Sequence, residues 1–227
     1  MRYVFLPGTL CDERVWLPVW KQLSLSARAY VPLQWANSLE EMLALTSDRT
    51  DPDGKNHLVG YSMGAYIAAL WALTYPDKVA SLTLMGYAPT GLSEQELKRR
   101  KTLLSQLKGG KVDVTANTYL ANMVLPEHSD DILPILTGMA SDLGAATLRA
   151  HVQSTTPRKD LTAKLGQLNC PVNLIAARQD AVAPFSAMQT AQQKITGARL
   201  LPVEDSGHMM MLEQPANVAA LLNELLA

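Results

Sequence analysis

Short apolar runs recur along the chain, and most of them stop at a glycine or a proline. Within each run the apolar residues follow one another instead of alternating with polar ones, which is typical of parallel strands that are buried on both faces. Pro202 lies in the last run, and proline fits only an edge strand or a strand end. These patterns predict six strands, at Tyr3–Leu6, Ala29–Val31, His57–Val59, Ser81–Met85, Val172–Ala176 and Leu200–Val203.

Helical patterns lie between these runs. The segment Ala65–Tyr75 is rich in Ala, Leu and Ile and stops at Pro76. The segment Asn217–Leu225 has apolar residues at helical spacing, with Pro215 near its start. This alternation predicts an α/β fold with a mostly parallel sheet of about six strands and helices on both faces.

The segment 89–166 interrupts the alternation, because it contains no predicted strand. Ser93 and Glu96 form a capping-box pattern, which predicts a helix that continues through Leu107. We expect this segment to be a helical cap inserted between two strands. Three further helical pieces are predicted in it, at Val112–Val124, Asp130–Met139 and Leu143–Val152.

The composition agrees with a globular chain that has one inserted subdomain. Apolar residues make up 48% of the 227 residues and charged residues 18%, so a substantial core can form. We expect residues 1–88 and 167–227 to form that core, with residues 89–166 as the cap. The formal net charge of -1 gives no global attraction for nucleic acid or an anionic membrane.

Several classes of protein do not fit the sequence. The two cysteines and four histidines have no metal-ligand spacing, so we expect no metal and two reduced thiols. No apolar run of about 18 residues occurs, and Pro7 and Gly8 cut the first run too short for a signal peptide. We therefore expect a cytoplasmic protein. No glycine-rich phosphate loop follows a predicted strand, which argues against nucleotide binding.

The pattern G-x-S-x-G occurs at residues 60–64, between a predicted strand and a predicted helix. Glycines permit a sharp turn there, which would expose the Ser62 hydroxyl at the end of the sheet. The amide of Met63, at the start of the helix, could then face a developing oxyanion. We predict that Ser62 is a nucleophile. The alternative is a glycine-rich helix start at which Ser62 is only a capping residue.

A serine nucleophile needs a base, and His208 is the predicted one. His208 follows the last predicted strand, so its loop lies at the carboxyl edge of the sheet, where the carboxyl ends of parallel strands meet and ligands of open sheets bind. His57 lies inside a strand and is expected to be buried. His128 and His151 lie in the cap and are expected to face solvent.

The base needs an acid that fixes its tautomer, and Asp180 is the predicted one. It follows the predicted strand at 172–176. Hydrolases whose nucleophilic serine lies in a G-x-S-x-G turn have their catalytic residues in the same chain order, serine, then acid, then histidine. The alternative, Asp205, is too close in sequence to His208 to reach the far nitrogen of its ring. We interpret Asp205 as a turn residue.

The first predicted strand ends at Pro7-Gly8, and the next residues can supply a second oxyanion amide. Either Thr9 or Leu10 could donate it, and Thr9 is favoured. The alternative is an ordinary turn at the end of a strand.

Together these motifs resemble the α/β-hydrolase superfamily, over nearly the whole chain. The segment 198–208 with Glu-Gln-Pro at 213–215, the Asp180 loop and the turn at Ser62 are similar to those of small capped bacterial esterases and lactonases, such as the pimeloyl-carrier-protein methyl esterase and 3-oxoadipate enol-lactonase groups. Two features differ. Pro7 stands where the family usually has a histidine, so the usual anchoring of that loop is not expected, and the initial antiparallel pair of strands is missing.

The resemblance implies a cofactor-independent hydrolase that acts on a small-molecule ester or lactone through an acyl-enzyme. A lyase of the menaquinone-pathway type, with the same fold and triad, and a non-catalytic ligand receptor remain alternatives. Neither nucleic acid nor a membrane is an expected partner. We expect the cap and neighbouring loops to supply the pocket, with lining residues at Tyr87, Met123, Val124, Leu125 and Met209.

A basic run at residues 98–101 could in principle dock an acidic carrier protein. Acidic residues at positions 94 and 96 lie beside it. We interpret the run instead as the solvated face of a helix, because mixed charge on an exposed helix is the common case.

Overall fold

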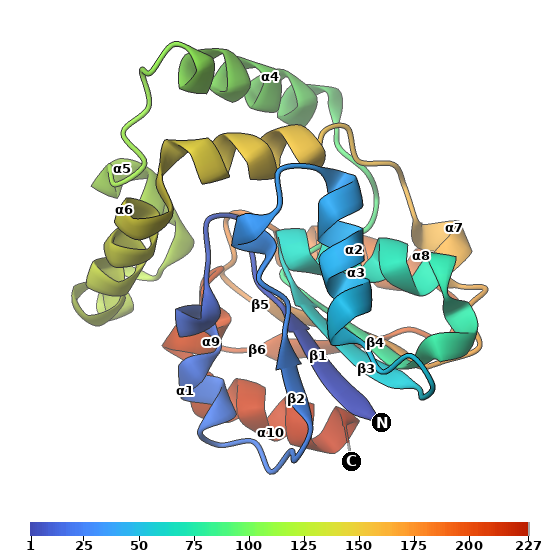
Figure 1. Cartoon of the computed structure of the whole chain (residues 1–227). Coiled ribbons are helices and arrows are strands. Elements are labelled where there is room, and N and C mark those ends of the chain that lie inside the picture. Colours follow the sequence, from blue (N-terminus) through green and yellow to red (C-terminus); the bar gives the residue numbers. More distant parts are fainter. Residues whose placement is uncertain (227) are drawn as a thin grey trace.

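A six-stranded sheet forms the centre of the molecule (Figure 1). The computed structural model describes residues 1–226, apart from the side chains of Asn117 and Thr118. The strand order is β2-β1-β3-β4-β5-β6, all neighbours are parallel, and β6 with Pro202 lies at an edge, as predicted. The strands are β1 (Arg2–Leu6), β2 (Arg28–Tyr30), β3 (Asn56–Tyr61), β4 (Val79–Met85), β5 (Val172–Ala177) and β6 (Arg199–Val203).

Successive strand residues point to opposite faces of the sheet, and both faces are buried. In β1, Val4 and Leu6 belong to one apolar cluster and Phe5 to the other. The first face is covered by α2 (Leu39–Arg49), α3 (Met63–Thr74), α7 (Thr162–Leu165) and α8 (Phe185–Lys194). The second is covered by α1 (Leu17–Trp20), α9 (Met210–Glu213) and α10 (Pro215–Leu225). The predicted doubly covered sheet is therefore confirmed.

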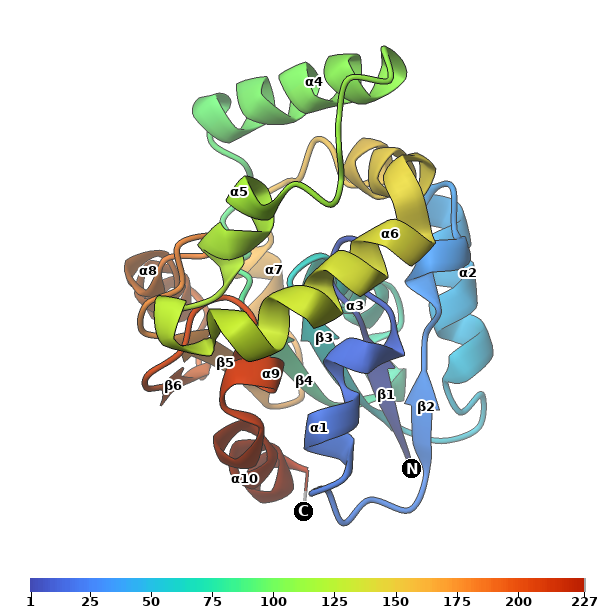
Figure 2. The ribbon, with the colours of Figure 1, turned by 90° about the vertical axis from the view of Figure 1, so that its left-hand side faces the viewer.

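Three helices lie above the carboxyl edge of the sheet, where α6 crosses beneath α4 (Figures 1 and 2). They are α4 (Glu94–Lys108), α5 (Asn117–Leu120) and α6 (Ser129–Ser154). The predicted capping box of Ser93 and Glu96 opens α4. The chain enters and leaves this region side by side, since Leu161 N–H donates to the Pro89 carbonyl at 2.9 Å. Helix α7 packs with the core.

The predicted helix at Val112–Val124 is largely absent. Only α5 and a short 3₁₀ turn (Ala121–Met123) are helical there. The Asp113 carboxylate accepts hydrogen bonds from the Thr115 amide and hydroxyl, a local turn that competes with helix formation.

The predicted helices at Asp130–Met139 and Leu143–Val152 are both present, as two helical segments of the stretch labelled α6. Gly144, with φ 72° and ψ 174°, is not helical and forms the kink at which they meet, because glycine accepts the positive φ that other residues avoid. The second segment shares an apolar cluster with α4, whereas Ile132, Leu136 and Met139 of the first belong to the cluster on the second face of the sheet. None of the helices within residues 1–226 is both long and apolar enough to span a membrane.

Candidate active site

Ser62 lies in the sharp turn between β3 and α3. Its backbone angles, φ 51° and ψ −112°, are ones that a residue with a β-carbon rarely adopts. Its amide donates to the Met85 carbonyl at 2.8 Å, which ties the turn to β4. Its hydroxyl makes no capping bond to α3 and instead lies 3.2 Å from His208 Nε2. The turn therefore directs the Ser62 hydroxyl toward His208, and Ser62 does not act as a helix-capping residue.

The two glycines of the motif are required by close packing. A β-carbon at Gly60 would lie 2.5 Å from Ala65 Cα, and one at Gly64 would lie 2.4 Å from the Leu6 carbonyl oxygen. Both distances are shorter than non-bonded atoms tolerate. Gly60 lets α3 fold back on β3, and Gly64 lets the loop after β1 lie against the start of α3. That loop contains Thr9, which is thereby brought beside the turn.

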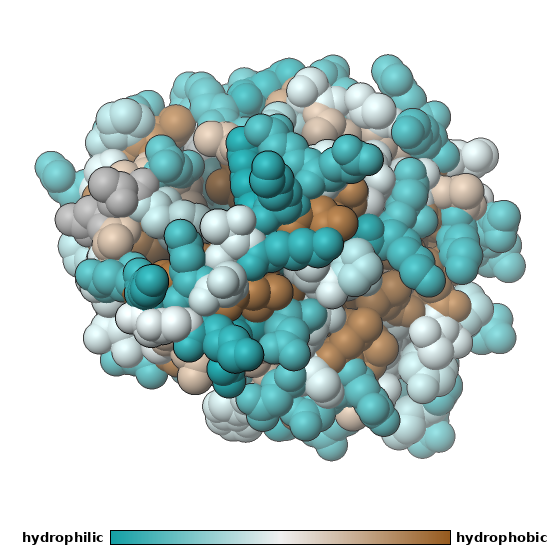
Figure 3. All heavy atoms as spheres, turned by 90° about the horizontal axis from the view of Figure 1, so that it is seen from above, coloured by the Kyte–Doolittle hydropathy of each residue, from teal (hydrophilic) through white to brown (hydrophobic). Residues whose placement is uncertain are grey.

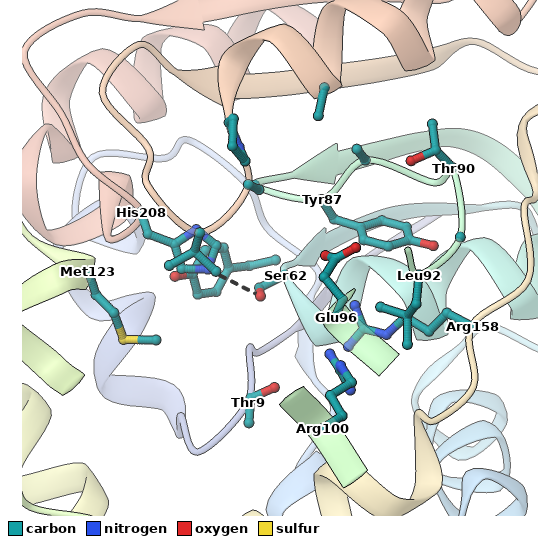
Figure 4. Close-up of a pocket in the computed structure, with 18 of the residues that line it drawn as sticks. Thr9, Ser62, Tyr87, Thr90, Leu92, Glu96, Arg100, Met123, Arg158 and His208 are labelled. Carbon is teal, nitrogen blue, oxygen red and sulfur yellow. Dashed lines mark hydrogen bonds between the residues drawn. The ribbon is translucent and has the colours of Figure 1, made fainter. Parts of the chain in front are cut away.

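Three side chains from three loops at the carboxyl edge form one hydrogen-bonded chain, and Figure 4 shows its link between Ser62 and His208. His208 Nδ1 lies 2.7 Å from Asp180 Oδ2, and His208 Nε2 lies 3.2 Å from Ser62 Oγ. An ionised carboxylate only accepts hydrogen bonds, so Nδ1 is the protonated nitrogen and Nε2 can accept from the serine hydroxyl. Asp180 and His208 are both buried. This arrangement can remove a proton from Ser62.

The Asp180 carboxylate is fixed by its own loop. Its Oδ1 accepts hydrogen bonds from the amides of Val182 and Ala183, each at 2.8 Å, which leaves Oδ2 directed at His208. Asp205, the alternative acid, is exposed, has φ 49°, and uses its carbonyl to accept from Gln214. It is a turn residue.

Two amides lie free at this edge of the sheet. Met63 is the first residue of α3, so its N–H has no acceptor within the helix. In the loop after β1, the Cys11 amide donates to the Gly8 carbonyl at 3.3 Å and the Leu10 amide donates to His151 Nδ1 at 3.1 Å. Within residues 1–226, the Thr9 amide has no acceptor. Of the two predicted donors, Leu10 is therefore engaged elsewhere and Thr9 is available.

His151 is buried, and the prediction that it faces solvent is wrong. Its Nδ1 accepts from the Leu10 amide and its Nε2 donates to the Leu33 carbonyl, both at 3.1 Å. Burial lowers the pKa of His151 to about 4, so the ring is neutral near pH 7. The amphipathic pattern of α6 does not reveal which polar residue lies beneath the helix. His151 thus anchors the loop after β1.

A cavity of about 230 Å³ opens at Ser62 and His208 (Figure 4). Cys11 lines it, but burial and, secondly, the charge of Asp12 raise the pKa of that thiol to about 12. Cys11 is therefore protonated and does not compete with Ser62 as a nucleophile. No group of three or more potential metal-ligating His, Cys, Asp or Glu side chains occurs in the described part of the chain.

Some of the predicted pocket residues line a cavity and others do not. Tyr87 and Met123 line the cavity, and Met209 lines a smaller apolar recess of about 20 Å³ that shares Met123 and Thr9 with it. Val124 and Leu125 do not line the cavity. Val124 is buried in the apolar cluster on the α6 side. The Leu125 amide donates to Glu213 at 2.8 Å. The 3₁₀ turn before them directs only Met123 inward.

Sequence reasoning missed the polar end of the cavity, formed by Glu96, Arg100, Tyr119 and Arg158. Arg100 belongs to the basic run at residues 98–101, for which the sequence predicts a solvated helix face. Lys98, Arg99 and Lys101 are indeed exposed, but Arg100 is half-buried and reaches the cavity. The only sequence signal is the helical spacing of Glu96 and Arg100, which places them on one side of α4. Seen from the cap side, the surface is mostly hydrophilic, with apolar patches among the hydrophilic side chains (Figure 3).

Comparison with known proteins agrees with this geometry. A model of the alpha/beta hydrolase family matches residues 3–221. A pimeloyl-[acyl-carrier protein] methyl ester esterase of Nitrosomonas europaea is 27% identical over 98% of this chain and 94% of its own length. Monoacylglycerol lipase ABHD6 of Homo sapiens is 25% identical over 75% of this chain and 54% of its own length. The family resemblance predicted from the motifs is confirmed.

Solved structures share the fold. A thermophilic esterase from Thermogutta terrifontis superposes with a TM-score of 0.83 at 19% identity, over 100% of this chain and 89% of the esterase. The enol-lactonase from Burkholderia xenovorans LB400 gives 0.81 at 16% identity, over 99% of this chain and 91% of the lactonase. At such identities the likeness concerns the fold alone.

Proposed function

The chain belongs to the alpha/beta hydrolase family, and on that basis we propose that it is a serine hydrolase that cleaves a carboxylic ester or lactone without a cofactor. The observation that supports this most strongly is the hydrogen-bonded chain from Ser62 through His208 to Asp180. Relatives described as a methyl ester esterase and a monoacylglycerol lipase support ester chemistry as the reaction class.

In the proposed reaction, Ser62 Oγ attacks the substrate carbonyl carbon while His208 Nε2 takes the serine proton. The carbonyl oxygen becomes an oxyanion and accepts hydrogen bonds from the amides of Met63 and Thr9. The carbon–oxygen bond to the alcohol then breaks, and His208 returns the proton to that leaving oxygen. An acyl-enzyme on Ser62 remains.

Water completes the cycle by the same steps. His208 Nε2 takes a proton from water, whose oxygen attacks the acyl carbon, and then returns that proton to Ser62 Oγ as the acid leaves. Asp180 stays ionised throughout and stabilises the imidazolium form of His208. The buried position of Asp180 and His208 keeps this interaction away from bulk water.

The proposal is tested by labelling and turnover together. We expect a fluorophosphonate probe to modify Ser62, with the adduct located by mass spectrometry, and the unmodified protein to hydrolyse p-nitrophenyl esters or small lactones. Replacing Ser62 by Ala should remove both signals while the circular dichroism spectrum is unchanged. Typical losses on removing such a nucleophile are on the order of 10⁶ in turnover. Unaltered turnover in Ser62→Ala would reject the assignment.

A further inference from the structure

Two arginine side chains meet in the wall of the cavity that contains Ser62. Arg100 comes from α4 and Arg158 from the segment that follows α6. Both guanidinium groups donate to the same oxygen, Thr155 Oγ1, at 3.2 Å and 3.4 Å. Arg100 also donates to the Thr155 carbonyl and the Thr156 hydroxyl. Two positive charges are therefore held side by side by neutral acceptors.

Neither guanidinium forms an ion pair with a carboxylate among the residues that the structure describes. Glu96 also lines the cavity, but its carboxylate accepts from the Ser93 amide and hydroxyl, at 2.8 Å and 2.7 Å, in the capping box of α4. Two cations and this one anion leave the polar end of the cavity with a net charge of +1. Half-buried like charges in contact are costly unless an opposite charge joins them.

Two polar groups at this end have no partner in the described structure. They are the Tyr87 hydroxyl and Arg158 Nε, both of them buried atoms. Tyr87 is 5% exposed, and its ring lies under the Arg158 guanidinium, 5.6 Å from Arg158 Cζ. Buried polar groups in folded proteins nearly always have a partner. Burial raises the pKa of Tyr87, so the hydroxyl keeps its proton and can donate.

The arginines remain charged in this setting. Burial and, secondly, the charge of Arg100 lower the pKa of Arg158 to about 10, and burial lowers the pKa of Arg100 as well. Both groups are still protonated near neutral pH. The site thus presents charged donors and a neutral phenol donor (Figure 4).

We propose that Arg100, Arg158 and Tyr87 bind a free carboxylate on the substrate, so that the enzyme acts on monoanionic ester or lactone substrates. One carboxylate neutralises the net charge of the site. A planar guanidinium matches the two carboxylate oxygens, and the Tyr87 hydroxyl supplies a further donor. The proposal rests on the function proposed above, since the same cavity contains Ser62 at its other end. The ester would lie at Ser62 and the carboxylate at the arginines.

The turnover test compares monomethyl adipate with its neutral analogue dimethyl adipate, and uses glutarate and suberate half-esters to vary the length. We expect kcat/KM for the preferred half-ester to exceed that of its dimethyl analogue by about 10- to 100-fold, the range for hydrogen bonds to charged groups. Arg158→Gln and Arg100→Gln should each reduce this preference at least about tenfold. Arg99→Gln removes an equal charge from the exposed side of α4 and should keep the preference.

A binding measurement separates this proposal from the proposed function. Calorimetric titration of Ser62→Ala should give a lower Kd for the half-ester than for the dimethyl ester, and adding Arg158→Gln should abolish the difference. Higher salt should weaken half-ester binding more than dimethyl ester binding. If half-esters bind selectively but the wild type hydrolyses neither ester, the carboxylate site stands and the hydrolase proposal fails. If the two kinds of ester bind equally, or the arginine variants weaken both equally, the carboxylate site is overturned.

Discussion

At the scale of single residues, the chemistry depends on which nitrogen of His208 has the proton. Asp180 decides this, because its Oδ1 is occupied by the amides of Val182 and Ala183 and only Oδ2 faces the ring. The carboxylate therefore acts through orientation as much as through charge. A neutral residue of the same shape tests that role directly.

Replacing Asp180 by Asn should reduce kcat by a factor on the order of 10⁴ with little loss of stability. The amide nitrogen of Asn can donate to Nδ1, which leaves Nε2 protonated and unable to accept from Ser62. Steady-state kinetics with a p-nitrophenyl ester, together with thermal unfolding, checks this. The matched control is Asp205→Asn, in the exposed turn next to His208, which should keep turnover. Equal losses in the two variants would contradict the assignment of Asp180.

At the scale of elements, the 3₁₀ turn at Ala121–Met123 is docked on the loop of His208. The Met209 amide donates to the Met123 carbonyl at 3.1 Å, and the buried Glu213 accepts from the Leu125 amide and the Ser206 hydroxyl. This docking fixes the backbone of the turn and leaves the Met123 side chain directed into the cavity. The turn therefore connects the cap to the chemistry without supplying a reacting group.

Replacing Met123 by Ala should shift the preferred acyl length without changing the chemistry. A shorter side chain enlarges the cavity where it meets the apolar recess, and an apolar pocket distinguishes one methylene by about 1–3 kcal/mol. The measurement is kcat/KM for esters of increasing length. Val124→Ala is the matched control, since Val124 is buried away from the cavity and should cost stability alone. A uniform loss at all lengths in Met123→Ala would contradict a specificity role.

At the scale of the whole molecule, His151 joins the cap to the core. It lies on α6, yet its two ring nitrogens bond the loop after β1 through Leu10 and the loop after β2 through Leu33. Leu10 has φ 54°, an unusual conformation for leucine that this bond helps to hold. The position of the Thr9 amide thereby depends on a residue of the cap.

The burial of His151 should make the protein sensitive to acid, because burial lowers the pKa of its ring. The pKa of His151 is about 4 in the folded protein and near 6.5 in an unfolded chain, so the unfolded state binds more protons between these values. The free energy of unfolding should therefore fall as pH is lowered from about 6.5 to 4, by about 3 kcal/mol from this group. Above pH 6.5 both states are neutral and the contribution is fully present.

Denaturant unfolding at pH 7 and pH 5 measures this effect. His151→Gln should be less stable than the wild type at pH 7, but its further loss on going to pH 5 should be smaller. His128→Gln, which changes a histidine at the surface of the cap, should keep the loss of the wild type. If the two variants lose stability equally on acidification, His151 is not the group responsible.

The fold was predictable because its signals are local. Buried parallel strands are mostly apolar, and most of the predicted runs stop at a Gly or a Pro, so all six strands were placed within two residues of their observed ends. The capping box of α4 is equally local. The helix predicted at 112–124 is largely absent because Asp113 forms a local turn that competes with helix formation. Composition does not reveal which of the two structures such a segment adopts.

By itself, the sequence determined the α/β class and the order of Ser62, Asp180 and His208, because each of the three directly follows a strand and parallel strands end at one edge. Only the tertiary structure decided which cap residues reach that edge. His151, Arg100 and Arg158 belong to or flank helices whose inward sides depend on how the cap packs over the core. Helical spacing defines a face but not what the face meets, so the buried histidine and the unpaired arginines emerge only when the cap is folded onto the sheet.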